Sequence, residues 1–275
     1  MCPVSRRFVQ GDGGFFESGL LVAHCLLVEL PTGLLLVDTG LSTADLAEPM
    51  RRLGRGFMMT ARPKRDFLGT AEAQVRALGF KVADVRDIAV THLDLDHAGG
   101  LSDFPEARVH VYEPELRAME QRRTPNEKLR YRLPHFEHGP RWSTHEVSGD
   151  LWFGFEAVRA LAEDVFMVPL VGHTRGHTGV AVRSDGGWLL HAGDAYFHHD
   201  EMKTPPHCPM GLSLFQSQVA IDDVARRRNQ ERLRELVRDH GDEVNVFSAH
   251  CPVEFAALRE RQRSVRPPAV TGATT

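Results

Sequence analysis

The chain has 275 residues and a mass of 30.8 kDa, with 42% hydrophobic and 25% charged residues. This composition is typical of a globular protein and excludes wholesale disorder, and the length suits one large domain. A formal net charge of −4 and a sequence pI near 6.4 argue against a general nucleic-acid binder, which usually has a pI above about 9.

The longest apolar stretch covers residues 20–37, but His24, Glu29 and the turn at 31–33 interrupt it. It is therefore too short for a transmembrane helix, which needs about 20 consecutive apolar residues. The N-terminal residues lack the basic, apolar and small-residue succession of a signal peptide. Four scattered cysteines without a CxxC pair are typical of free thiols in a reducing compartment. We therefore expect a cytoplasmic protein without a membrane partner.

The predicted elements mix strands and helices along the chain. Strands are expected at 20–30, 34–38, 87–91, 108–112, 151–154, 164–171, 178–183, 188–192 and 244–248, and helices at 70–78, 114–121 and 222–239. The helix at 222–239 is expected to bury Val224 and Leu233 and to expose most of its arginines. Because no repeat or linker divides the chain, we expect one α/β domain over residues 1–263 and a disordered tail over 264–275.

Residues 122–145 follow neither a helical nor a strand period, so the segment 113–147 is predicted to contain an insertion that forms a lid. The stretch is rich in basic residues: Arg122, Arg123, Arg130, Arg132, His135, His138 and Arg141. These residues could recognise an anionic group of a substrate. A solvated insertion, or a contact between the subunits of a homodimer, is the more common role of such a stretch.

The strongest signal for chemistry follows the strand at 87–91, where His92, Asp94, Asp96 and His97 lie within six residues. In an extended chain, alternate side chains point to the same face, so the first three are expected to point one way. The two intervening leucines then anchor in the core, and His97 follows as the chain turns. Open α/β sheets place their ligands just past the carboxyl ends of strands, so this segment predicts a metal site.

Three later strands also end at one metal-ligating residue type each, namely His173, Asp194 and His250. One such residue alone is more often a cap or turn residue, but together with the segment 92–97 they predict a metal centre. Two divalent cations about 3.5–4 Å apart lower the pKa of a shared water from 15.7 to about 7. Hydrolysis is the reaction that such a centre supports.

This order of motifs resembles the metallo-β-lactamase superfamily, in particular its lactonase and glyoxalase-II-like branch. The resemblance covers about residues 20–255 and includes Asp38-Thr39-Gly40. It implies a four-layered αβ/βα sandwich with the metal site at the sheet edge. It also implies a ligand set divided between two metal ions: His92, Asp94 and His173 for one, Asp96, His97 and His250 for the other, and Asp194 as a bridge.

The resemblance implies roles for other residues as well. Asp38 would lie behind the ligands, and His177 would support them from outside or be exposed. Tyr196 is similar in position to the tyrosine of acyl-homoserine-lactone lactonases that orients the substrate carbonyl, so it is predicted to be catalytic. Asp96 is predicted to combine the roles of ligand and acid/base.

Most members of the superfamily have histidine where this chain has Asp94. An oxygen ligand makes the site harder, so iron or manganese competes better with zinc, which remains the expected metal. We predict that a metal-bridging hydroxide attacks the carbonyl of a small ester, lactone or thioester. The alternatives are a phosphodiesterase on the same centre, a diiron oxidoreductase like the flavodiiron proteins, and metal binding without turnover. The sequence determines neither the substrate, nor the metal in the cell, nor the oligomeric state.

Overall fold

The computed structural model describes residues 1–147 and 149–265, whose strands form two sheets. The first sheet has the order β1-β2-β3-β4-β5 and the second the order β11-β10-β9-β8-β7-β6. The strands are β1 (Leu26–Leu30), β2 (Gly33–Val37), β3 (Val85–Ala89), β4 (Arg108–Tyr112), β5 (Arg141–His145), β6 (Asp150–Trp152), β7 (Phe155–Ala162), β8 (Val165–Pro169), β9 (Thr178–Ser184), β10 (Gly187–His191) and β11 (Val244–Phe247).

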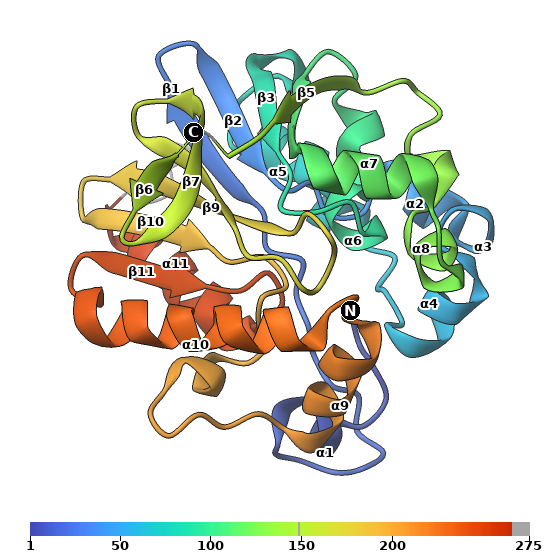
Figure 1. The fold of residues 1–275 in the computed structure, drawn as a ribbon. Helices are drawn as coiled ribbons and strands as arrows, with labels where there is room; N and C mark the ends of the chain where they lie inside the picture. Colours follow the sequence, from blue (N-terminus) through green and yellow to red (C-terminus); the bar gives the residue numbers. More distant parts are fainter. Residues whose placement is uncertain (148, 266–275) are drawn as a thin grey trace, which may run out of the picture.

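Helices lie between and around these strands (Figure 1). The α-helices are α1 (Arg6–Gln10), α2 (Thr43–Ala47), α3 (Pro49–Arg52), α4 (Gly54–Thr60), α5 (Ala71–Ala77), α6 (Leu95–Ala98), α7 (Glu113–Gln121), α8 (Pro125–Arg130), α9 (Met210–Val219), α10 (Asp223–His240) and α11 (Pro252–Val265). Short 3₁₀ turns are η1 (Phe67–Gly69), η2 (Val82–Asp84), η3 (Gly99–Asp103), η4 (Leu133–His135) and η5 (His199–Met202). Among the described residues, no helix is long and apolar enough to span a bilayer.

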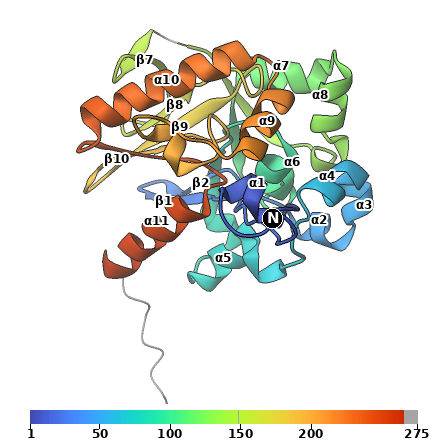
Figure 2. The same cartoon turned by 90° about the horizontal axis from the view of Figure 1, so that it is seen from below.

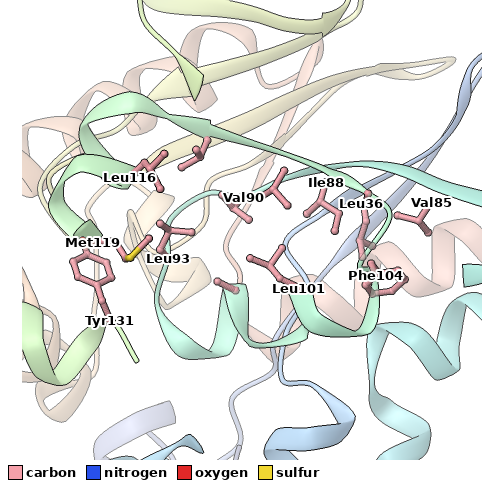
Figure 3. Close-up of a cluster of buried hydrophobic side chains, with 14 of the residues drawn as sticks. Leu36, Val85, Ile88, Val90, Leu93, Leu101, Phe104, Leu116, Met119 and Tyr131 are labelled. Carbon is pink, nitrogen blue, oxygen red and sulfur yellow. The ribbon is translucent and has the colours of Figure 1, made fainter. Parts of the chain in front are cut away.

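Three apolar layers join these elements into a four-layered sandwich. One layer lies between the first sheet and its helices, where Ile88 and Val109 pack with Val75 of α5 and Leu116 of α7. Figure 3 shows Ile88 and Leu116 in this layer. A second lies between the other sheet and α10, which covers that sheet on its outer side (Figures 1 and 2). The third joins the two sheets through residues from both: Leu35, Val37, Ala89, Val165, Val180 and Val182. The predicted fold class is confirmed.

Strand direction explains why the polar loops gather at one edge. Strands β2 to β5 are parallel, so their carboxyl ends lie on the same side, and β2 and β3 lead into Asp38 and the segment 92–97. In the second sheet β10 and β11 are also parallel, and the β8–β9 turn lies at the carboxyl end of β10 because β9 is antiparallel to it. This is the edge at which open α/β sheets place their ligands.

Several local predictions need correction. The first strand begins at Leu26 rather than at residue 20, and the stretch 122–145 contains α8, η4 and the whole of β5. On α10, Val224 is 71% exposed, whereas Arg226 is buried and donates to Gln216 and Asp223. These polar partners compensate the burial of a guanidinium group that helical periodicity alone would place in solvent.

The predicted domain boundaries and the lid stay predictions. Of the expected tail, residues 264 and 265 belong to α11, and residues 266–275 lie outside the described part of the chain.

Candidate metal centre

The segment that follows β3 is extended only as far as Asp94. Helix α6 begins at Leu95, and the Asp94 carbonyl accepts hydrogen bonds from the backbone N–H groups of His97 and Ala98. The predicted extended alternation is therefore wrong for Asp96, because a helical turn rotates it away from the face that His92 and Asp94 share. The two leucines between them are buried, as predicted. Leu93 packs in the cluster drawn in Figure 3.

The chain packs closely behind α6, as the small residues 98–100 predict. The Thr39 N–H donates to the His97 carbonyl at 2.8 Å, and the Gly100 N–H donates to the Gly40 carbonyl at 2.9 Å. A Cβ atom at Gly100 would lie 2.5 Å from the Thr39 carbonyl oxygen, so only glycine allows this approach. The turn that carries His97 is thereby fixed against the end of β2.

The structure brings the seven predicted ligands together in two adjoining sets, within each of which one ligand atom per residue lies within 4.8 Å of the others. We call them the first group (His92, Asp94 and His173, with Asp194) and the second group (Asp96, His97 and His250). Asp194 faces both. Its Oδ2 lies 3.3 Å from His173 Nε2 and 3.8 Å from His92 Nε2. Its Oδ1 lies 3.0 Å from His250 Nε2 and 3.2 Å from His97 Nε2.

Three of the four histidines are oriented through their other ring nitrogen. Nδ1 of His97 lies 2.8 Å from Asp38 Oδ2, and Nδ1 of His250 lies 2.7 Å from the Val22 carbonyl oxygen. Nδ1 of His92 lies 3.0 Å from Thr91 Oγ1. These contacts direct Nε2 toward Asp194, which is the usual way in which a protein positions a ligating imidazole.

Asp38 is buried behind His97 and is also fixed by Thr91, whose N–H and hydroxyl donate to it at 2.7 and 2.8 Å. Burial alone would raise the pKa of Asp38, but the neighbouring His97 lowers it to about 2. Asp38 is therefore an ionised carboxylate. It accepts a hydrogen bond from Nδ1 of His97 and is not itself a metal ligand.

The two groups differ in the pKa values of their histidines. Burial lowers the pKa of His97, but the carboxylates of Asp194 and Asp38 raise it more. The pKa of His97 therefore lies well above its usual value of 6.5. Burial and the nearby Arg130 lower the pKa of His173 to about 4. His173 is thus uncharged at neutral pH, and one of its ring nitrogens carries a lone pair.

Arg130, the last residue of α8, contacts the first group. The sequence did not predict this contact. Its side chain is buried, and its Nη1 lies 2.7 Å from Asp94 Oδ2 and 3.0 Å from His173 Nε2. Burial would raise the pKa of Asp94, but the Arg130 charge and His92 bring it well below 3.8. The polar composition of residues 122–145 gave no sign that Arg130 is buried, because arginines in such a stretch usually lie in solvent.

Glu115 of α7 is a second residue that the sequence did not indicate. It is fully buried and accepts hydrogen bonds from the Leu93 N–H, the Gly176 N–H and the Tyr131 hydroxyl, at 3.0 to 3.1 Å. One carboxylate therefore links the loops that carry His92 and His173 to the segment that carries Arg130.

Tyr196 does not reach either group, contrary to prediction. It is fully buried in the core beneath α10, and its hydroxyl donates to Glu254 at 2.7 Å. The carboxylate partner of this buried hydroxyl keeps it away from a substrate. His177 is buried rather than exposed, and its Nε2 accepts the Asp194 N–H at 2.8 Å, which positions the shared carboxylate.

The residues present fit a divalent metal. His92 Nε2 and Asp94 Oδ1 are buried and have no hydrogen-bond partner among the described residues, although buried polar atoms are normally paired. Imidazole nitrogen and carboxylate oxygen are the ligands of zinc, iron and manganese sites. A cation between these atoms would satisfy them.

Comparison with known proteins identifies the class. The family model of the metallo-beta-lactamase superfamily matches residues 18–244, and the chain belongs to this superfamily. It is a metal-dependent hydrolase. A probable metallo-hydrolase of Mycobacterium tuberculosis is 37% identical over 243 residues, which cover 87% of this chain and 78% of the relative. An N-acyl homoserine lactonase of Azorhizobium caulinodans is 29% identical over 82% of this chain and 85% of its own.

Solved structures share the fold. An N-acyl homoserine lactone hydrolase with the product N-hexanoyl-L-homoserine at its catalytic metal center has a TM-score of 0.66 and 21% identity, covering 93% of this chain and 92% of its own. A dizinc quorum-quenching lactonase has a TM-score of 0.60 and 16% identity, over 92% and 84% of the two chains.

Proposed function

We propose that the protein is a dinuclear metallohydrolase that acts on a small ester, lactone or thioester. The observation that carries this proposal is the position of Asp194, whose two carboxylate oxygens face different sets of ligands at 3.0 to 3.8 Å. Each oxygen of such a carboxylate can bind one of two neighbouring cations, whereas a site for one ion needs only one of the two oxygens.

The first group would hold one metal through His92, Asp94 and His173, and the second group would hold the other through Asp96, His97 and His250, with Asp194 between them. Zinc is the expected metal, because histidine and carboxylate ligands suit it, and the carboxylate of Asp94 makes iron or manganese more competitive. A dizinc lactonase among the structural neighbours supports zinc.

When bound, two such cations supply a nucleophilic water and polarise the oxygen of the scissile group. The chain itself supplies the proton transfer. Asp96 is partly accessible, with 13% of its side chain exposed, and lies 3.7 Å from His250 Nε2. We assign Asp96 the transfer of a proton to the leaving oxygen or sulfur, in addition to its role as a ligand.

A small carbonyl substrate is favoured over a phosphodiester. The lactonases among the relatives support it. Two arginines of the basic stretch also have partners within the protein, because Arg132 donates to the carbonyls of Arg51 and Arg52, and Arg141 donates to that of Glu106. A homodimer stays a prediction.

The test is a hydrolysis panel of esters, lactones, thioesters and phosphodiesters, run on the protein as purified, after chelation, and after addition of zinc, manganese or iron. We expect turnover of an ester, lactone or thioester that chelation abolishes and metal restores. Preferential cleavage of phosphodiesters would replace this function with the alternative one. Absence of hydrolysis by protein that has bound two metal ions would contradict both.

A further inference from the structure

Arg130 contacts the two atoms of the first group that a metal ion would need most. Its Nη1 lies 2.7 Å from Asp94 Oδ2 and 3.0 Å from His173 Nε2. A guanidinium group only donates hydrogen bonds, so His173 Nε2 accepts here through its lone pair. An imidazole nitrogen has one lone pair in the ring plane, and the same lone pair would bind a metal. His173 therefore serves Arg130 or a metal ion, but not both at once.

The two atoms that Arg130 contacts also lie close to each other. Asp94 Oδ2 and His173 Nε2 are only 3.0 Å apart. A single positive group can therefore contact both atoms at once. The side chain of Arg130 supplies that charge from within the protein.

Arg130 is built into the site and does not approach it from solvent. Its Nη2 donates to the Val219 carbonyl at the end of α9, and the residue is 8% exposed. The next residue, Tyr131, is buried and donates to Glu115, which also binds the backbone of Leu93. The end of α8 is thus tied to the loop that carries His92 and Asp94. The cost of burying the guanidinium is offset by its pairing with Asp94.

The second group has no counterpart of Arg130. Within residues 1–147 and 149–265, its ion pairs are with Asp38, with Asp194 and among its own members, and no arginine or lysine side chain bonds to it. The Nε2 atoms of His97 and His250 face each other at 3.3 Å. A metal ion can enter this group without displacing an arginine.

We propose that Arg130 is a resident cation of the first group, so that the two metal subsites load in sequence. The second group binds its ion tightly, and the first group binds its ion more weakly because Arg130 must first leave Asp94 and His173. The inference rests on the proposed function, since it requires both groups to be metal sites. The protein would then bind one ion at low metal concentration and two ions at high metal concentration.

The test is a titration of the chelator-stripped full-length protein with Zn²⁺ by calorimetry, and with Co²⁺ by visible absorption. We expect two steps in the wild type, the first at least about tenfold tighter than the second. The Arg130→Met variant should tighten the weaker step by about 10- to 100-fold and leave the tighter step unchanged, the range typical of residues that contact metal ligands. Arg130→Lys, which keeps the charge, should retain a weaker second step.

The matched control is Arg132→Met, two residues along the chain, because the Arg132 guanidinium donates only to the backbone carbonyls of Arg51 and Arg52. This variant should reproduce the two wild-type steps. If Arg130→Met does not fold, the wild-type titration and Arg130→Lys still decide the question.

The outcomes separate this inference from the proposed function. Two wild-type steps of equal affinity, or a weaker step unchanged in Arg130→Met, would overturn the role of Arg130 and leave the dinuclear centre standing. One bound ion in the wild type and two in Arg130→Met would support the inference. Binding of no ion by the wild type or by Arg130→Met would overturn the ligand assignment itself, and the proposed function with it.

Discussion

The two ligand groups share Asp194 but differ in how their histidines are held. In the second group, Nδ1 of His97 and Nδ1 of His250 each have an oxygen partner within 2.8 Å. In the first group, Nδ1 of His173 has no partner among the described residues, and its Nε2 accepts from Arg130. The second group is thus oriented for a metal ion, whereas the first is already paired with an arginine. Similar ligand types can therefore form two subsites of different affinity.

The largest effect is expected where the two groups meet. Asp194→Asn removes the shared charge while it keeps the shape of the side chain. We expect kcat/KM for the substrate that the wild type hydrolyses to fall by about 1,000-fold or more, because several kcal/mol of metal-derived stabilisation are lost. Steady-state kinetics together with elemental analysis measure both changes. A variant that retains activity within tenfold of the wild type would show that Asp194 does not bridge the groups.

A second substitution acts mainly on the second group. Asp38→Asn weakens the interaction that orients His97, so the tighter metal-binding step should weaken by about 10- to 100-fold, while the weaker step changes little. The matched control is Asp87→Asn, because Asp87 is also a buried carboxylate that pairs with a histidine, His110, at 2.9 Å. Calorimetric titration with zinc measures both variants. Equal effects of the two substitutions would mean that Asp38 acts only through folding.

A third substitution affects the first group. In Glu115→Gln, an amide NH₂ replaces one oxygen that now accepts from Leu93, Gly176 or Tyr131. We expect the free energy of unfolding to fall by about 1–3 kcal/mol, the cost of an unsatisfied buried donor. Urea denaturation of the metal-free protein measures this change. The weaker metal-binding step should also weaken, and a selective loss of the tighter step would contradict the arrangement.

The smallest expected effect concerns His24, a histidine outside both groups. It provides a reference for the pH dependence of stability that does not come from the ligands. Burial and the nearby His191 lower the pKa of His24 to about 3. Since the unfolded chain takes up this proton below about pH 6.5 and the folded protein does not, stability is lost as the pH falls below that value. In His24→Gln, the loss between pH 6 and pH 5 should be smaller by about 1 kcal/mol, measured by denaturation of metal-free protein. An unchanged slope would contradict the low pKa.

The sequence could predict the ligands because strand ends carry them. His92, His173, Asp194 and His250 each follow an apolar strand, and the strands converge at one sheet edge whatever the details of the helices. The division into two groups followed from the family resemblance and not from the strand alternation, because it depends on the start of α6 at Leu95, a local turn within an alternating pattern.

Other features depend on contacts between distant segments and had no local signal. Arg130 and Glu115 belong to polar helices, and their burial follows from packing against loops 22 to 61 positions away. Tyr196 illustrates the opposite error, because its similarity to a tyrosine of the lactonases suggested a role at the site, yet its hydroxyl pairs with Glu254 in the core. Partners that lie far apart in the sequence determine where such charged and hydroxyl groups point.

The measurement that tests the central claim most directly is anomalous X-ray diffraction at the zinc edge, on crystals of the full chain grown with excess zinc. The account predicts two anomalous peaks on either side of the Asp194 carboxylate, one among His92, Asp94 and His173 and one among Asp96, His97 and His250. Peaks elsewhere, or no peak beside Asp194, would contradict it.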